Sequence, residues 1–169
     1  MNSLISRRLS ARYGQLYDTA AVGEIHVVEK MRACGAVIGG EGNGGVIYPT
    51  LHAGRDALVA TALFLTHLAK KGIKASALRK QYPNYYIHKR KIPIPPREEL
   101  QRLLKQIAKQ YRQYPQQNID GLRIDFPKKW VHLRPSNTEP ILRIYAEAES
   151  KQAATDLAET FAVFLKGIT

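Results

Sequence analysis

A glycine-rich segment in the first third of the sequence, GGEGNGGVIYP, has the composition of a loop that contacts a hydroxyl-rich ligand. Its glycines, Gly44 among them, allow positive φ angles and let the backbone come close to a ligand. Glu41 is the one charged side chain in the segment and can accept charge-assisted hydrogen bonds from sugar hydroxyls, while Asn43 can both donate and accept. A flexible surface loop with an incidental acid explains the same composition. The flanking runs are strand-like and no helix follows directly, so the segment is not a nucleotide-binding fingerprint.

A second polar segment, RPSNTEP at 134–140, has the composition of an anion-binding loop. The arginine offers a planar guanidinium suited to phosphate oxygens, and the hydroxyls, amide and backbone N–H groups that follow are typical of an anion nest. The predicted phosphate-binding residues are Arg134, Ser136, Asn137 and Thr138. Glu139 is unsuited to direct phosphate contact and is expected to orient the arginine or to cap the turn, and Arg143 is expected to face solvent or Glu147. A hairpin loop rich in turn-forming residues accounts for the segment equally well.

Three segments resemble, in the same order, segments of the α-D-phosphohexomutase superfamily, which includes phosphoglucomutases, phosphomannomutases and phosphoglucosamine mutases. They are TAAVGEIHVVEKM, GGEGNGGVIYPTLHAGRDA and WVHLRPSNTEPILRIYAEA. The resemblance covers almost the whole chain, from Asn2 to the last predicted helix. One such segment could be a coincidence, but three in the family's order indicate membership.

The resemblance implies a four-domain enzyme that interconverts hexose 1-phosphate and hexose 6-phosphate through a hexose 1,6-bisphosphate. In such an enzyme the first domain carries a phosphoserine and the second binds Mg²⁺ through a DGDGDR-like loop. This sequence has neither element, so we expect a C-terminal portion that is inactive alone and has no metal site. Residues 1–81 would be the end of the third domain and 82–169 the fourth. The implied partners are a phosphorylated hexose and the two missing N-terminal domains.

The resemblance also assigns roles by position. Glu41 and Asn43 would contact sugar hydroxyls, and the loop beginning at Arg134 would hold the phosphate. Many members have a histidine where this chain has Gly45, so that acid/base group is absent here. His52, seven residues on, is the candidate to approach the site instead, although a packed or capping histidine is equally compatible with its position. These loops do not specify which hexose is preferred.

The strong positive charge of the chain needs an explanation of its own. The net charge is +12, and thirteen of the 26 Lys and Arg residues lie between Lys70 and Arg112, against Glu98 and Glu99 on the acidic side. A solvated helix face, phosphorylated ligands and nucleic acid are all compatible with such a cluster, with nucleic acid the least favoured. A nucleic-acid-binding module would use nearby aromatic side chains as stacking groups. These would be Tyr82, Tyr85, Tyr86 and Tyr111.

The remaining composition favours a globular protein in a reducing, cytoplasmic setting. Cys34 is the single cysteine, so no internal disulfide can form. The longest apolar run, Ala57 to Leu68, is too short to cross a bilayer and is predicted to be a buried helix.

The elements expected to position the two loops fall into two groups. A partial layered α/β domain comes first, with predicted strands at 15–19, 36–39 and 46–48 and helices at 24–32, 55–71 and 75–81. The helix at 24–32 is expected to end at Gly35. A small β-α-β-β-β-α domain follows, an α+β fold similar to that of the TATA-binding protein. Its strands are predicted at 85–94, 121–126, 130–133 and 141–146, and its helices at 97–111 and 151–165.

Overall fold

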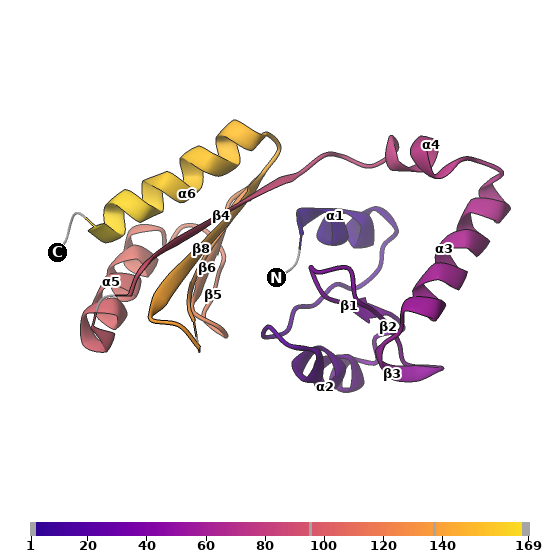
Figure 1. Cartoon of the computed structure of the whole chain (residues 1–169), viewed down its shortest axis with the longest axis horizontal. Coiled ribbons are helices and arrows are strands. Elements are labelled where there is room, and N and C mark those ends of the chain that lie inside the picture. The colour runs from indigo at the N-terminus through magenta and orange to yellow at the C-terminus, as the bar shows by residue number, and fades with distance from the viewer. Residues whose placement is uncertain (1–2, 95, 137, 167–169) are drawn as a thin grey trace. The chain divides into compact units, whose positions relative to one another are not determined.

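The computed structural model describes residues 3–94, 96–136 and 138–166, and the chain divides into two compact units, Met1–Pro83 and Asn84–Thr169 (Figure 1). Unit 1 combines helices with a three-stranded antiparallel sheet in the order β1-β2-β3. Its elements are α1 (Leu4–Arg12), α2 (Glu24–Cys34), β1 (Gly39–Gly40), β2 (Val46–Tyr48), β3 (His52–Arg55), α3 (Ala57–Lys71) and α4 (Ala75–Arg79).

The helix ends of unit 1 follow from capping residues in the sequence. The predicted helix at 24–32 is confirmed as α2, which ends at Gly35 in the left-handed conformation (φ 65°). Asp56 begins α3 because its Oδ1 accepts hydrogen bonds from the backbone N–H groups of Leu58 and Val59. Gly72 ends α3 with φ 62°. These caps fix where the chain leaves the helices and enters the loops.

Some of the elements predicted for unit 1 differ from the structure, and one helix was not predicted. Residues 15–19 form no strand, and β1 is limited to Gly39–Gly40. The helix predicted from residue 55 begins at Ala57, because Arg55 pairs with Ile47 in β3 and Asp56 supplies the cap. The helix α1 was not predicted; the Ser3 hydroxyl caps it by accepting from the Ile5 N–H.

The apolar helix α3 is exposed, not buried as its composition predicts. No residue of α3, all of which the structure describes, is fully buried. Leu58 is 83% exposed and Leu65 is 56% exposed. The reason is that α3 packs against β2 in unit 1, and so small a sheet cannot cover more than one side of a long helix.

Unit 2 is a five-stranded antiparallel sheet in the order β4-β8-β7-β6-β5, with two helices. Its elements are β4 (Tyr86–Pro93), α5 (Arg97–Gln110), β5 (Gln116–Gln117), β6 (Leu122–Asp125), β7 (Trp130–Pro135), β8 (Ile141–Ala148) and α6 (Lys151–Lys166). The predicted β-α-β-β-β-α order is confirmed, with the two-residue strand β5 added at the sheet edge. The core lies between the sheet and both helices, which cover the same face (Figure 1).

That core follows from the two hydrophobic periods in the sequence. In α5, Leu100, Leu103 and Ile107 recur at helical spacing and are buried. The strands contribute alternate residues such as Leu133 and Ile144, which lie directly opposite each other and are fully buried.

The other face of the sheet carries polar and charged side chains in cross-strand register. Lys91 of β4 lies opposite Arg143 of β8, and Arg143 lies opposite Arg134 of β7. Residues directly opposite each other on paired strands project from the same face of a sheet. The fold therefore places three cations in one row across three strands, at the end of the β7–β8 hairpin.

Candidate functional site

The first predicted loop is a closed hairpin turn between β1 and β2. The Glu41 N–H donates to the Gly45 carbonyl at 2.9 Å, and the Gly44 N–H donates to the Glu41 carbonyl at 3.1 Å. Gly44 has φ 94°, which favours glycine. The Gly45 N–H donates to Oδ1 of Asn43 at 3.0 Å, so the side-chain NH₂ of Asn43 is the group that could donate to a ligand. The turn has a defined backbone that directs these side chains.

An arginine that the sequence analysis missed positions Glu41. Nη1 of Arg55 lies 3.3 Å from Oε2 of Glu41, whose side chain is 15% exposed. Nε of Arg55 contacts Oε2 of Glu24 at 2.6 Å, and the Arg55 backbone N–H donates to the other oxygen at 3.1 Å. These two hydrogen bonds from Arg55 hold the pKa of Glu24 below its ordinary value. Helix α2, strand β3 and the loop are thereby joined through one guanidinium.

Two glycines, Gly40 and Gly45, leave room for the close approach of the hairpin backbone and for the Arg55 side chain. A Cβ atom at Gly45 would lie 2.4 Å from Cδ of Arg55, and one at Gly40 would lie 2.5 Å from the Gly45 carbonyl oxygen. A side chain at position 45 therefore requires Arg55 to move away from the loop. The sequence did carry a signal for Arg55, because it comes directly before the helix cap Asp56 and so had to lie at the end of a strand or loop.

His52 is on the largely exposed strand β3, and its side chain lies beside that of Glu24 in α2. A Cβ atom at Gly54 would be 2.7 Å from Nε2 of His52 and 2.9 Å from Oε1 of Glu24, which places these two side chains over the same glycine. Among the residues that the structure describes, no hydrogen bond or ion pair joins His52 to Glu41. The role suggested for His52 stays a prediction.

The second predicted loop begins where β7 ends, at a half-buried arginine held by a neighbouring turn. Nε of Arg134 lies 2.7 Å from Oδ2 of Asp120, outside hydrogen-bond geometry, so the contact is an ion pair. Because Asp120 meets Nε, the two terminal guanidinium nitrogens are the ones that could bind a phosphate as a fork. The same turn contains Gly121, with φ 84°, where a Cβ atom would lie 2.1 Å from the Leu133 carbonyl oxygen. The turn that orients Arg134 thus depends on a glycine.

The loop itself offers side-chain donors more than backbone donors. The Ser136 N–H donates to the Ile141 carbonyl at 2.9 Å and closes the hairpin, so it is not part of an anion nest. The Thr138 N–H and the Ser136 Oγ are 3.5 Å apart. Asn137 lies outside the described residues. The nest expected from the composition is therefore not formed by the Ser136 amide, and the Ser136 and Thr138 hydroxyls are side-chain donors that the described part of the loop presents.

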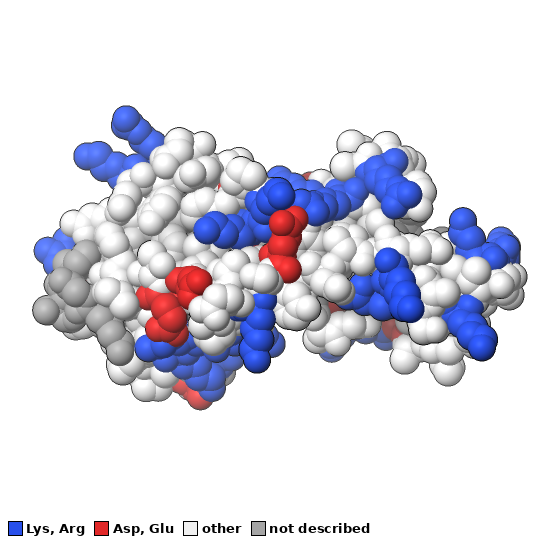
Figure 2. All heavy atoms as spheres, turned by 90° about the horizontal axis from the view of Figure 1, so that it is seen from above, with Lys and Arg blue, Asp and Glu red and all other residues white. Residues whose placement is uncertain are grey.

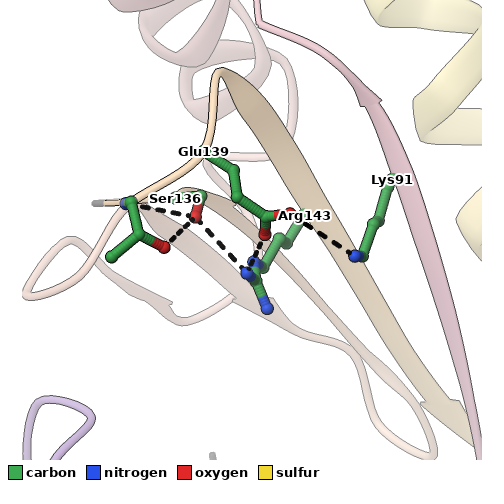
Figure 3. Close-up of polar contacts among 5 residues, drawn as sticks. Lys91, Ser136, Glu139 and Arg143 are labelled. Carbon is green, nitrogen blue, oxygen red and sulfur yellow. Dashed lines mark hydrogen bonds and ion pairs between the residues drawn. The ribbon is translucent and has the colours of Figure 1, made fainter.

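Arg143 of β8 and Lys91 of β4 contact this loop, although the sequence analysis did not include them among the phosphate-binding residues (Figure 3). Nη2 of Arg143 lies 3.4 Å from Oγ of Ser136 and 2.5 Å from Oε2 of Glu139. Nζ of Lys91 lies 3.9 Å from Oε1 of Glu139. Tyr145 and Glu139 raise the pKa of Arg143 above its ordinary value, so its charge is permanent.

One alternative in each of two expectations about these side chains is wrong. Glu139 does not orient Arg134; it pairs with Arg143 and Lys91, because the turn brings it back over the strand that follows. Arg143 does not face Glu147, whose Oε1 accepts from the indole N–H of Trp130 at 3.1 Å. The register of β7 and β8 places Arg143 opposite Arg134, and the sequence alone does not give that register.

The basic stretch from Lys70 to Arg112 is divided between the two units. Its residues lie in or beside α3 and α4 of unit 1 and β4 and α5 of unit 2, and Figure 2 colours all Lys and Arg side chains in view blue. Within β4, Lys91 lies on the open face of the sheet, whereas Arg90 pairs with Glu159 of α6 on the other. Tyr111 packs against Phe161 in the core, so it cannot stack on a base. This distribution weakens the nucleic-acid interpretation.

Two family models match this sequence, and together their matched ranges include both loops. Residues 1–86 match the model described as phosphoglucomutase/phosphomannomutase, alpha/beta/alpha domain III. Residues 92–163 match the phosphoglucomutase/phosphomannomutase C-terminal domain. The chain belongs to the phosphoglucomutase/phosphomannomutase family. The sugar loop candidate lies in the domain III match and the phosphate loop candidate in the C-terminal domain match.

Individual members of the family match most of this chain. A phosphoglucomutase/phosphomannomutase of Thermococcus kodakarensis is 35% identical over 152 residues, which cover 89% of this chain and 33% of that protein. A phosphoglucosamine/phosphogalactosamine mutase of Sulfurisphaera tokodaii is 32% identical over 168 residues, covering 98% of this chain and 37% of that protein. The crystal structure of a phosphoglucomutase/phosphomannomutase family protein from Burkholderia thailandensis superposes with a TM-score of 0.75 at 29% identity, covering 95% of this chain and 34% of that one.

The chain spans about a third of the length of these relatives. Two further features bear on what it can do. Within the described ranges, no helix is long and apolar enough to cross a bilayer. The same residues contain no group of three or more His, Cys, Asp or Glu side chains that could hold a metal ion.

Proposed function

We propose that this chain supplies the sugar- and phosphate-recognition loops of a phosphohexose mutase, an enzyme that interconverts hexose 1-phosphate and hexose 6-phosphate. The observation that carries the proposal is the row of Lys91, Arg143 and Arg134 at the end of the β7–β8 hairpin, in a chain of this family. Beside this row, the Ser136 hydroxyl lies 3.4 Å from Nη2 of Arg143 and 3.5 Å from the Thr138 hydroxyl. A phosphate dianion is the ligand that such a set of charge-assisted donors suits best.

The donor set fits the need to accept either end of a bisphosphorylated hexose. An intermediate with phosphates at both ends must turn round during the reaction, so the site has to hold a phosphate whichever carbon bears it. Guanidinium groups recognise charge and oxygen geometry and are indifferent to the sugar ring. Discrimination between hydroxyls would fall to Glu41, held by Arg55, and to the side-chain NH₂ of Asn43.

The phosphoryl transfer itself is assigned to residues outside this set. A phosphohexose mutase of this family would use a phosphoserine and Mg²⁺, and the described residues of this chain do not fit a Mg²⁺ site. Phosphoryl transfer depends on positioning and on neutralising charge at the transferred group. The role proposed for this chain is to bind the phosphate at the non-reacting end of the substrate. We propose that the 169 residues alone do not turn over hexose phosphate.

A titration of the isotope-labelled chain with glucose 6-phosphate, followed by NMR, tests the recognition role. We expect shifts of the amide signals of residues 41–45 and 134–143, and the 134–143 signals alone should shift with inorganic phosphate. Glucose without phosphate is the matched control and should leave the 134–143 signals unchanged. Absence of any shift at millimolar glucose 6-phosphate would refute the role. Product formation by the chain alone, given glucose 1-phosphate and its bisphosphate, would refute the predicted inactivity.

A further inference from the structure

A carboxylate of the chain itself, that of Glu139, contacts two of the cations beside the phosphate loop. The two oxygens of Glu139 divide between two strands: Oε2 lies 2.5 Å from Nη2 of Arg143, and Oε1 lies 3.9 Å from Nζ of Lys91 (Figure 3). Ser136 contributes its hydroxyl to the same arginine at 3.4 Å. The group between Lys91 and Arg143 is therefore an anion with hydrogen-bond-accepting oxygens, as a phosphate would be.

The position of Glu139 allows it to leave. Its side chain is 46% exposed and lies on the turn between the paired strands, so water can solvate the carboxylate once it separates from Arg143. Ion pairs at this degree of exposure contribute little because water and salt screen them. A phosphate with two negative charges interacts more strongly with the same two cations than a carboxylate with one.

We propose that Glu139 is a built-in competitor of the ligand phosphate, and that Lys91 is a further phosphate-binding residue. The incoming dianion displaces the Glu139 carboxylate and takes its place between Lys91 and Arg143. This inference rests on the proposed function, because it assumes that the loop binds a phosphorylated sugar. A bisphosphorylated intermediate that must turn round has to leave the phosphate loop during the reaction. The return of the Glu139 carboxylate to Lys91 and Arg143 assists that release, so the row of three cations does not hold the phosphate too tightly.

Four single variants separate this exchange from general charge effects. Glu139→Gln removes the competitor, and Glu149→Gln is its control, because Glu149 follows the opposite end of β8 and pairs with Lys128. Lys91→Gln removes the proposed phosphate-binding cation. Lys89→Gln is its control, since Lys89 lies on the same face of the same strand, opposite Tyr145. All four side chains are at least partly exposed, so the variants are expected to fold, and unchanged thermal unfolding would establish this.

Binding of glucose 6-phosphate, measured by isothermal calorimetry at low salt, is the readout. We expect Glu139→Gln to bind about fivefold more tightly than the unaltered chain and Lys91→Gln about fivefold more weakly. Both controls should stay within about twofold of the unaltered chain. In the unaltered chain, the side-chain carboxyl ¹³C signal of Glu139 should shift as the ligand is added.

The outcomes distinguish this inference from the proposed function. If neither the unaltered chain nor Glu139→Gln binds glucose 6-phosphate, both fail. If the unaltered chain binds and Glu139→Gln shows no gain, or Glu149→Gln shows the same gain, only the exchange is overturned. Equal losses in Lys91→Gln and Lys89→Gln would remove Lys91 from the site. Weak binding by the unaltered chain together with clearly tighter binding by Glu139→Gln alone would support the exchange.

Discussion

Acid should destabilise unit 2 because its sheet buries a neutral histidine next to the phosphate loop. His132 of β7 is 7% exposed, and its Nε2 lies 2.5 Å from the Asp120 carbonyl oxygen, to which the neutral ring can donate. Burial is the largest cause that lowers the pKa of His132 below its ordinary value of 6.5, and the charge of Arg123 lowers it further. The hydrogen bond and charge of Asp120 oppose the shift only in part.

The sign and size of the effect follow from proton linkage. Below pH 6.5 the unfolded chain takes up a proton at this histidine, whereas the folded unit does not until its lower pKa is reached. The free energy of unfolding therefore falls as the pH falls through that window, by up to about 1.4 kcal/mol for each pH unit from this one group. Above pH 6.5 His132 contributes no pH dependence, because the ring is neutral in both states.

Urea unfolding followed by tryptophan fluorescence measures this directly. Trp130 is the single tryptophan of the chain and is fully buried in the same strand, so its signal reports unit 2. His132→Gln keeps a side-chain donor for the Asp120 carbonyl but does not titrate. We expect the unaltered chain to lose stability between pH 6.5 and pH 5 and the variant to lose less. An identical pH dependence in both proteins, or a gain of stability on acidification, would refute the reasoning.

Three further predictions concern the scaffold. Gly121→Ala should lower the free energy of unfolding of unit 2 by more than about 1 kcal/mol, because the φ of 84° disfavours a side chain and the new Cβ would meet the Leu133 carbonyl oxygen. Urea unfolding measures this loss, and an unchanged midpoint would contradict the predicted strain. Leu103→Ala should cost about 2 to 5 kcal/mol in the same assay, whereas Val163→Ala at an exposed position of α6 in the same unit should change stability by less than about 0.5 kcal/mol, and equal effects would disprove the assigned burial. Asp56→Ala should destabilise α3 by about 1 kcal/mol and speed amide exchange in its first turn, and unchanged exchange would show that the cap is unimportant.

Local patterns in the sequence were sufficient for the elements whose own residues determine them. The apolar stripe of α5 and the alternation in β7 and β8 predicted the core of unit 2, and Gly35 predicted the end of α2. The same patterns do not reveal what covers an apolar helix, which is why α3 was expected to be buried. That outcome depends on the surface available to pack against it.

The candidate site was predictable only where its residues are neighbours in the chain. The glycine-rich turn and the loop after Arg134 stand out by composition. Arg55 and Lys91 do not, because their partners are distant in the chain, as in the contact of Arg55 with Glu24 across 31 residues. The contacts of Arg143 with Glu139 and Ser136 are closer in the chain but depend on how the turn folds back over β8. Register decides which side chains share a face, and a shift of one residue would move Lys91 to the side of the helices.

The affinity for glucose 6-phosphate of a chain without its two loop arginines tests the central claim most directly. The double variant Arg134→Gln, Arg143→Gln removes two charges from the row, and the double variant Arg97→Gln, Arg112→Gln removes two from exposed positions at the ends of α5. Calorimetry should show at least about a tenfold loss of affinity in the first protein and little change in the second, because charge-assisted hydrogen bonds are lost only in the first. Equal affinities in the two proteins would contradict the assignment of this loop as the phosphate-binding site.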